Sequence, residues 1–324
     1  MITKKTVFVL GAGASMHYGY PSGETLLREI QKILNAPDSF AHKVINELSH
    51  YGHIEGDIKR FAKALGETGR SSIDAFLEHR PEFIDIGKHF IASVLIPNEK
   101  AEPLSATARN LKMGNWFQYL YNKMNSKFEE FGDNQISFVT LNYDRSLEHF
   151  LFSALQADYG KGENDCAEQL DKIPIIHVHG QLGLLPWQDK KAGRAYASGI
   201  DIERKREEFQ TSARAIKIIH EVENADDIPE FIKAQRLMNE ANQIYFLGFG
   251  YDPTNCKRLK IPDSSVWKAG TGYGLLHQER REVGKLLGYR PEGSKYGRGD
   301  VPVLQLSPMQ VDCLEFLREF AELT

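Results

Sequence analysis

Three short segments of the chain end in side chains that could bind a nucleotide or act on a sugar. They comprise residues 7–15, 138–144 and 175–180. Each begins as an apolar run typical of a buried strand and ends in glycine, amide, carboxylate or imidazole groups. Glycine lets a backbone approach a phosphate, and the other groups orient water or transfer protons. The pattern therefore predicts strand ends that carry a site.

The first segment contains Gly11 and Gly13, between an apolar run and a helical pattern over 25–34. A glycine turn in this position lets the free N–H groups at the helix start face a pyrophosphate. Ser15 or Ala14 stands where the usual dinucleotide motif has its third glycine. A tight turn without a ligand is the alternative interpretation.

The second segment places Asn142 and Asp144 between a strand pattern and a helical pattern over 145–155. Asn and Asp are favoured helix caps, because they satisfy backbone N–H groups that otherwise lack partners. A structural cap is therefore one interpretation of this segment, and a ligand-binding strand end is the other.

The third segment carries His177 and His179, which alternate along a predicted strand and should face the same side. A His-x-His pair can ligate zinc, although no cysteine or carboxylate follows closely to complete such a site. An ordinary histidine in a sheet is the second alternative. A general base is the third interpretation, because an unperturbed imidazole pKa of ~6.5 suits proton transfer near neutral pH.

The composition is typical of a globular protein of 324 residues, with 41% hydrophobic and 26% charged residues. A net charge of −4 gives no general attraction to nucleic acid or to a membrane surface. The three cysteines are scattered without a Cys-x-x-Cys pair, so we expect a reducing, cytoplasmic setting. A signal peptide after Lys4 and Lys5 is the alternative, but its apolar run is too short, and no run approaches the ~18 residues of a membrane span.

Apolar runs rich in Val, Ile and Phe recur along the chain, with helical periodicity between most of them. They occupy residues 6–10, 136–141, 173–178, 216–219, 243–247 and 301–304. This alternation predicts an α/β fold with a Rossmann-like parallel sheet covered by helices.

We expect one domain over 1–324, with a helical subdomain at about 35–135 inserted after the first strand and helix, because the first two strands are too far apart for an ordinary crossover. Helical patterns in the insert cover 41–48, 54–65, 73–77, 83–95 and 116–131. The polar stretch 183–209 is expected to form a mobile loop near His179. A glycine-rich turn is expected at 269–274.

Taken in order, these motifs resemble the sirtuin family, whose Gly-Ala-Gly-x-Ser loop, Thr-Gln-Asn-Ile-Asp segment and His-Gly pair form a pocket for NAD. The resemblance is closest to bacterial sirtuin-like proteins that destroy NAD during phage infection. It implies that Asn142 contacts the nicotinamide ribose or positions water, that Asp144 receives the carboxamide, and that His179 is the base for a ribose hydroxyl. The other contacts to NAD that it implies come from Gly11, Ala12, Gly13, Ser15, Pro21, Thr140, Gly248 and Gly250.

Departures from the deacylases of that family imply hydrolysis. The sequence lacks the two Cys-x-x-Cys pairs that hold their structural zinc, and Pro21 is followed by Ser22 rather than by their Asp-Phe-Arg. Without the shielding phenylalanine, the pocket should admit water and release nicotinamide and ADP-ribose. Leu141 replaces the family glutamine, which removes the ribose contact expected from that side chain.

The resemblance thus predicts an NAD glycohydrolase, with NAD as substrate and no metal, that acts as an NAD-depleting effector in antiphage defence. It implies a homo-oligomer and a separate sensing partner, such as a HerA-type ATPase. A module that binds NAD or an ADP-ribose derivative without cleaving it is the first alternative. A zinc-free deacylase is the second.

Overall fold

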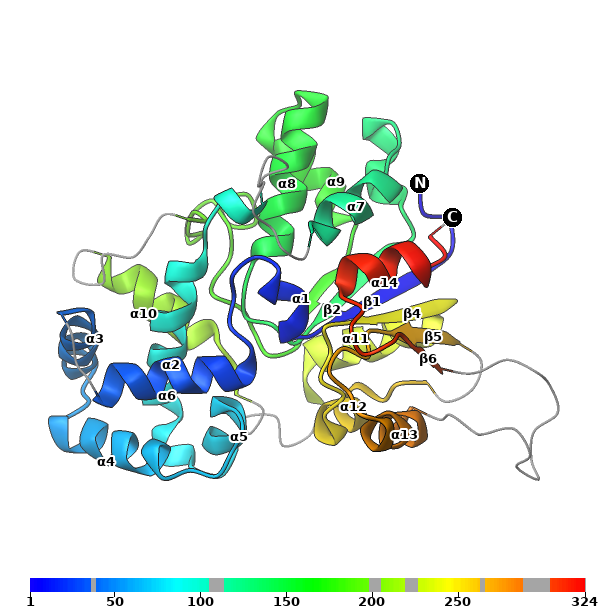
Figure 1. The fold of residues 1–324 in the computed structure, drawn as a ribbon. Helices are drawn as coiled ribbons and strands as arrows, with labels where there is room; N and C mark the ends of the chain where they lie inside the picture. The colour runs from blue at the N-terminus through cyan, green and yellow to red at the C-terminus, as the bar shows by residue number, and fades with distance from the viewer. Residues whose placement is uncertain are drawn as a thin grey trace.

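A parallel sheet of six strands, in the order β3-β2-β1-β4-β5-β6, lies at the centre of the computed structural model, with helices on both faces (Figure 1). The predicted Rossmann-like α/β fold is confirmed. The structure describes residues 1–35, 39–104, 114–197, 205–218, 227–262, 266–287 and 304–323. Its strands are β1 Thr6–Leu10, β2 Ile136–Thr140, β3 Ile175–His177, β4 Gln243–Leu247, β5 Trp267–Gly270 and β6 Leu304–Leu306.

The three central strands form because their side chains are accommodated on both faces of the sheet. Every residue of β1, β2 and β4 is buried. Phe8 of β1 lies opposite Phe138 on one side and Tyr245 on the other. Since successive residues point to opposite faces, Phe8 enters a larger core, whereas Val7 and Val9 enter a smaller one.

The two cores are covered by different helices. The larger core is covered by α1 Ala12–Met16, α2 Gly23–Asn35, α7 Trp116–Lys123, α8 Ser146–Tyr159, α9 Glu163–Asp171, α10 Arg206–Ala215 and α14 Cys313–Glu319. The smaller core is covered by α11 Pro229–Glu240, α12 Pro253–Leu259 and α13 His277–Leu286.

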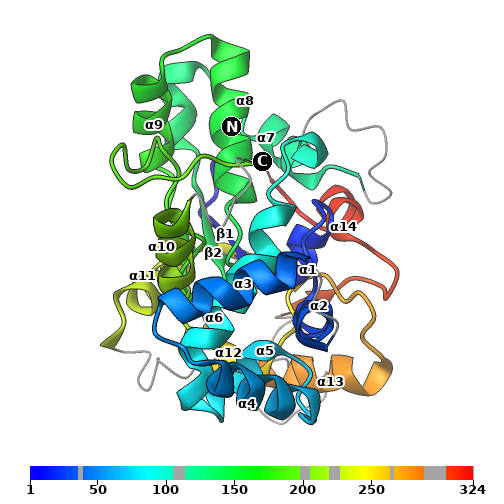
Figure 2. The same ribbon diagram turned by 90° about the vertical axis from the view of Figure 1, so that its left-hand side faces the viewer.

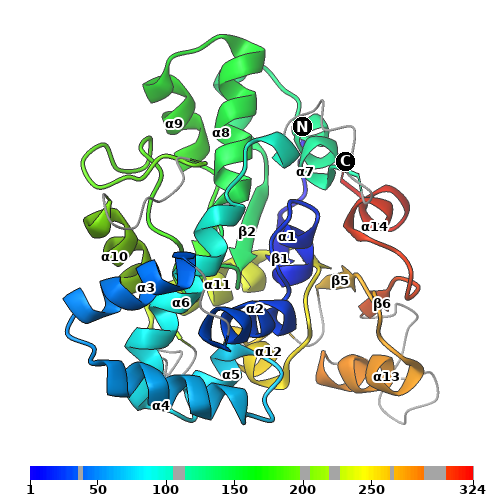
Figure 3. The same cartoon turned by 60° about the vertical axis from the view of Figure 1, so that its left-hand side comes forward.

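The segment between α2 and β2 is helical, as expected. It begins with α3 Ser39–His50, α4 Glu55–Gly66, α5 Ile73–Glu78 and α6 Ile84–Leu95. Figures 2 and 3 show α3 to α6 grouped at one end of the molecule, opposite α8 and α9. Their apolar faces belong to the same continuous core as one face of the sheet, so the insert packs against the sheet directly. The described part of the segment also contains α7 and the 3-10 helices η1 Pro81–Phe83, η2 Ile96–Asn98, η3 Glu102–Leu104 and η4 Phe128–Asp133.

Two strand predictions need correction. The run 216–219 is not a strand: Ile216 makes one isolated bridge to Gly180, and residue 219 lies outside the described residues. Ile216 and Ile218 are buried in the core without pairing in the sheet, and burial alone accounts for their apolar side chains. Conversely, β5 occupies the start of the expected glycine-rich turn at 269–274, since its short sequence gives little strand signal.

Two further boundaries differ from the sequence patterns. The expected helix 116–131 ends at Lys123, and a 3-10 helix follows, because Asn125 and Ser126 favour turns over helix. Residues 301–303 of the predicted last strand lie outside the described part, and β6 begins at Leu304.

Candidate active site

The predicted site residues gather mainly where the chain connections change faces of the sheet. The connection from β1 to β2 crosses the larger core, whereas α12, between β4 and β5, lies on the smaller core. In open parallel sheets, ligands bind outside the carboxyl ends of the strands at such a point. The segments after β1, β2, β3 and β4 therefore border the most favourable position for a ligand.

Between β1 and β4 the glycines serve close packing of two backbones. Gly11 N–H donates to the carbonyl of Leu247 and Gly13 N–H to that of Gly248, each at 3.0 Å. A Cβ on Gly13 would lie 2.7 Å from the Cα of Gly248, so a larger residue does not fit there. The expectation that these N–H groups are free to face a phosphate is wrong for Gly11 and Gly13, because both already donate to carbonyls.

Ser15, Asn142 and Asp144 form one hydrogen-bonded cluster, although 127 residues separate Ser15 from Asn142. The Asn142 amide donates to the carbonyl of Gly11 and to Oγ of Ser15, both at 2.9 Å. Ser15 Oγ in turn donates to Asp144 Oδ2 at 2.6 Å. The amide oxygen of Asn142 takes no part in these bonds. The structure thus brings together the predicted residues of the first two segments.

The Asp144 carboxyl group is buried, and burial raises its pKa despite hydrogen bonds from Ser146 and Ser15. It also receives the backbone N–H of Ser146 at 3.1 Å, but the N-cap of α8 is Arg145, so Asp144 supports the helix start from the residue before the cap. Asp144 is therefore a buried carboxyl group beside the helix start that can retain a proton above its ordinary range.

His177 belongs to this cluster and was not among the predicted catalytic residues. Its Nδ1 lies 2.9 Å from the carbonyl oxygen of Asn142, and its Nε2 lies 2.5 Å from Oε1 of the buried Glu148. Burial disfavours the charged ring, but Glu148 outweighs this and raises the pKa of His177. A glutamate one turn into the helix after Asp144 was the available sequence signal for this partner.

His179 does not join that cluster. β3 ends at His177, and the turn that follows directs the His179 ring against Phe231 of α11, at 5.7 Å between ring centroids. The expectation that both histidines face the same side is wrong, since His177 contacts α8 and His179 contacts α11. His179 is only 3% exposed, and neither ring nitrogen makes a hydrogen bond of good geometry within the described part of the chain, although the Asn255 side chain lies close enough to raise its pKa as a hydrogen-bond partner. Burial lowers its pKa to about 4, so the ring is neutral at pH 7.

Two residues of α12 near His179 also have buried polar atoms, and neither was predicted from the sequence. Asn255 Oδ1 and Arg258 Nη1 are buried and make no hydrogen bond to any described residue. Both residues are close enough to influence the pKa of His179. Asp252 caps this helix, and the capping signal Asp-Pro predicts that Asn255 and Arg258, three residues apart, share a helix face. Buried polar groups without partners are costly, which points to a ligand or ordered water.

The other predicted NAD contacts are more dispersed. Thr140 is buried and its Oγ1 accepts the N–H of Asn142 at 3.0 Å, whereas Gly250 is exposed. Ala12 is half-buried in the first turn of α1. Pro21 lines a separate hollow of about 540 Å³ between α2 and α6. The cavity at the Asn142 cluster itself measures only about 10 Å³, so a nucleotide could enter only after neighbouring side chains move.

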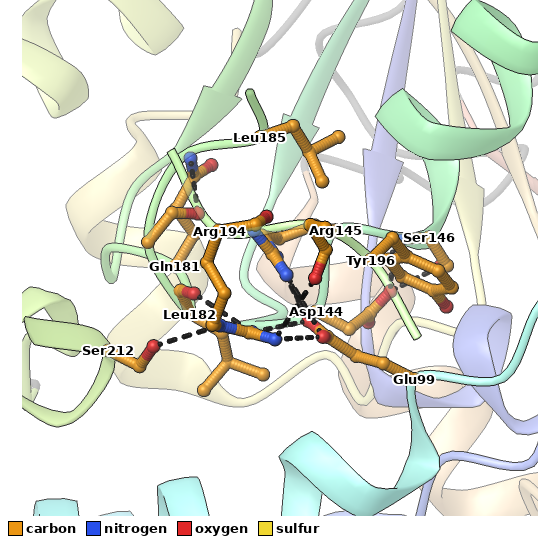
Figure 4. A network of polar contacts seen from close by, with 12 residues as sticks. Glu99, Asp144, Arg145, Ser146, Gln181, Leu182, Leu185, Arg194, Tyr196 and Ser212 are labelled. Carbon is orange, nitrogen blue, oxygen red and sulfur yellow. Dashed lines mark hydrogen bonds and ion pairs between the residues drawn. The ribbon is translucent and has the colours of Figure 1, made fainter. Parts of the chain in front are cut away.

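A buried network of ion pairs holds residues 182–196, which follow β3, next to Asp144 (Figure 4). Glu99, which follows η2 within the insert, accepts paired hydrogen bonds from Arg145 at 2.9 Å and from Arg194 at 2.5 and 2.8 Å. Arg145 also donates to the carbonyls of Leu184 and Arg194. The mobile loop expected at 183–209 is therefore not found over 183–197; residues 198–204 lie outside the described part.

A scan against protein-family models and a search of curated proteins both gave no match to this chain. Among the described residues, no helix combines the length and apolar character needed to cross a membrane.

Proposed function

We propose that this chain hydrolyses the N-glycosidic bond of NAD and releases nicotinamide and ADP-ribose. The observation that carries the proposal is the set of buried polar atoms without partners on His179, Asn255 and Arg258, at the carboxyl ends of β3 and β4. A ligand with hydroxyl or phosphate groups would satisfy them. The Ser15–Asn142–Asp144 cluster lies at the same edge of the sheet, so an extended substrate would contact both sets.

The residues suggest a division of roles. Asp144, with its raised pKa, would hold the carboxamide of nicotinamide, and Asn142 would orient a water molecule towards the anomeric carbon. As the carbon–nitrogen bond breaks, its electron pair neutralises the nicotinamide ring, so the leaving group needs no proton. The attacking water forms the new carbon–oxygen bond and gives its proton to neutral His179, which passes it to solvent. Arg258 would bind a phosphate or a ribose hydroxyl.

A wider role rests on the sequence resemblance. A sirtuin-like NAD hydrolase of antiphage defence would deplete NAD when a partner protein, such as a HerA-type ATPase, reports infection. The homo-oligomeric state and cytoplasmic location belong to the same proposal.

The test is nicotinamide release from NAD by the purified chain, alone and with candidate partners. Asn142→Ala and His179→Ala should each abolish release, while His277→Ala, which removes an exposed histidine of α13, should retain it. The melting temperature of each variant should be measured as well, because the buried His179 ring packs against Phe231 and its truncation should lower stability while the fold remains intact. Full activity in either of the first two variants would remove that residue from the mechanism.

A second candidate function is binding of NAD or an ADP-ribose derivative without cleavage. The pKa of about 4 at His179 favours it, because that value makes the ring a weak base. Calorimetry that shows binding of NAD, together with no nicotinamide release under any condition, would select this function over hydrolysis.

A further inference from the structure

Three potential metal ligands meet in the helical insert, away from the candidate active site. His53 lies in the turn before α4, and Asp85 and His89 lie one turn apart on α6, so they share a helix face. Each offers a ligand atom, and these atoms all lie within 4.8 Å of one another. The sequence did not reveal the cluster, because 32 residues separate His53 from Asp85 in a part of the chain without a recognisable motif.

The distances suit a small ion after minor side-chain rotation. His53 Nε2 lies 2.6 Å from Asp85 Oδ2, and His89 Nδ1 lies 4.0 Å from the same oxygen. Bonds of about 2.0–2.1 Å in a tetrahedral zinc site place neighbouring ligand atoms about 3.3 Å apart. The first distance is shorter than this value, and the ligand atoms of the three residues lie within 4.8 Å of one another, so all three side chains must shift to bind one ion. His89 would present Nε2 to the ion, because its Nδ1 already contacts the carbonyl oxygen of Asp85.

His89 is held in place as metal ligands usually are. The ring is 1% exposed, stacks on Tyr51 at 4.9 Å between centroids, and places Nδ1 2.8 Å from the carbonyl oxygen of Asp85. Such a contact to a backbone carbonyl keeps the proton on Nδ1, fixes the ring orientation and leaves Nε2 as the nitrogen that can bind a metal. Its other nitrogen, Nε2, is buried and has no hydrogen-bond partner in the described ranges, so the protein leaves part of the ring's bonding capacity unused.

We propose that His53, Asp85 and His89 bind one divalent transition-metal ion, with zinc as the best-suited candidate. Two imidazoles and one carboxylate are a common ligand set for zinc and for ferrous iron. His53 also lines a hollow of about 500 Å³ beside Arg80 and Glu82, so the fourth position is open to water. The bound ion would join the turn before α4 to α6 and stabilise the insert.

The test measures zinc binding by the full chain after treatment with a chelator. We expect one zinc per chain by elemental analysis and a higher melting temperature when zinc is restored. Asp85→Asn and His53→Gln should each weaken the affinity at least tenfold. Both side chains lie near the surface, so these variants should fold even if His89→Gln does not. His50→Gln, an exposed histidine at the end of α3, is the matched control and should bind zinc normally.

Two results would overturn the proposal. One is the absence of zinc binding, or equal binding by the wild type, Asp85→Asn and His53→Gln. The other is zinc that survives these two substitutions but is lost in His177→Ala, which would place the metal at the carboxyl edge of the sheet. Neither result depends on NAD cleavage, so the metal site can fail while the proposed function stands.

Discussion

Two histidines only two residues apart have opposite electrostatic environments. His177 faces the buried carboxylate of Glu148, which raises its pKa despite burial, whereas His179 has no acidic partner among the described residues and its pKa falls to about 4. The difference follows from the turn after β3, which sends the two side chains to opposite faces of the sheet. In the proposed hydrolysis, the neutral ring of His179 would therefore accept the proton, whereas His177 pairs with Glu148.

The depressed pKa of His179 predicts a pH dependence of stability. Because the unfolded chain binds a proton near pH 6.5 and the folded chain only near pH 4, the contribution of His179 is complete above pH 6.5 and is lost as the pH falls towards 4. At pH 5 the loss is about 2 kcal/mol of unfolding free energy. The free energy of unfolding, measured with urea, should fall between pH 7.5 and pH 5 in the wild type. In His179→Asn this fall should be smaller by about 2 kcal/mol.

His277→Asn is the control for this measurement, because that histidine is exposed and should leave the pH dependence unchanged. The opposite contribution of His177, which is present at low pH and lost as the pH rises through its raised pKa, is common to all three proteins. An identical pH dependence in wild type and His179→Asn would contradict a depressed pKa at this site.

Among the elements, the insert and the stretch after β3 are joined by Glu99. This carboxylate, 1% exposed in its side chain, receives both Arg145, which precedes α8, and Arg194. Because Arg145 directly follows Asp144 in the chain, the network also fixes the strand end that carries the site. The hydroxyl groups of Tyr20 and Tyr196, 2.9 Å apart, add a second link to the loop after α1.

Glu99→Gln should destabilise the fold strongly. It leaves two buried guanidinium groups without their counter-charge, and breaking such a buried pair costs about 3–5 kcal/mol. Urea unfolding measures the loss, and limited proteolysis should show new cleavage within 183–197. The matched control is Glu24→Gln, which breaks an exposed pair with Arg28 and should cost less than about 1 kcal/mol. Equal small losses in both variants would show that the network does not hold this stretch in place.

Across the whole molecule, the insert contacts the segments that carry the proposed site. Asp74 Oδ1 accepts a hydrogen bond from Tyr143 at 2.5 Å, and Glu78 lies 3.8 Å from Arg258. Both acids belong to α5, so this helix touches the strand end beside Asn142 and also the helix beside His179. The cavity at the Asn142 cluster, of about 10 Å³, is too small for a nucleotide in this conformation. Movement of the insert is therefore the simplest way to admit one.

This arrangement predicts low basal turnover and activation by a partner. We expect the isolated chain to self-associate and to hydrolyse NAD slowly, with turnover at least about tenfold higher, or ~1.4 kcal/mol of barrier, once its partner is supplied. Nicotinamide release with and without the partner, together with light scattering for the mass, makes the comparison. Rapid hydrolysis by a monomer, unaffected by any partner, would contradict gating and indicate a housekeeping enzyme.

The sequence by itself determined the α/β class, the central strands and most helices of the insert. Long apolar runs such as that of β1 identify central strands because both of their faces must be buried. It also indicated that Asn142 and Asp144 follow a strand, because the apolar run and these residues are neighbours in the sequence. The sequence did not show whether Ile216 belongs to a strand or is only buried, because both situations favour the same apolar side chains.

Only the tertiary structure decided which side chains meet. Sheet order brings Ser15 to Asn142, and one turn after β3 separates His179 from His177. The clusters around Glu99 and around Asp85 likewise join residues with no shared motif. Periodicity assigns a residue to a face of its own strand or helix, but packing between elements chooses its partners, and that packing depends on the whole chain at once.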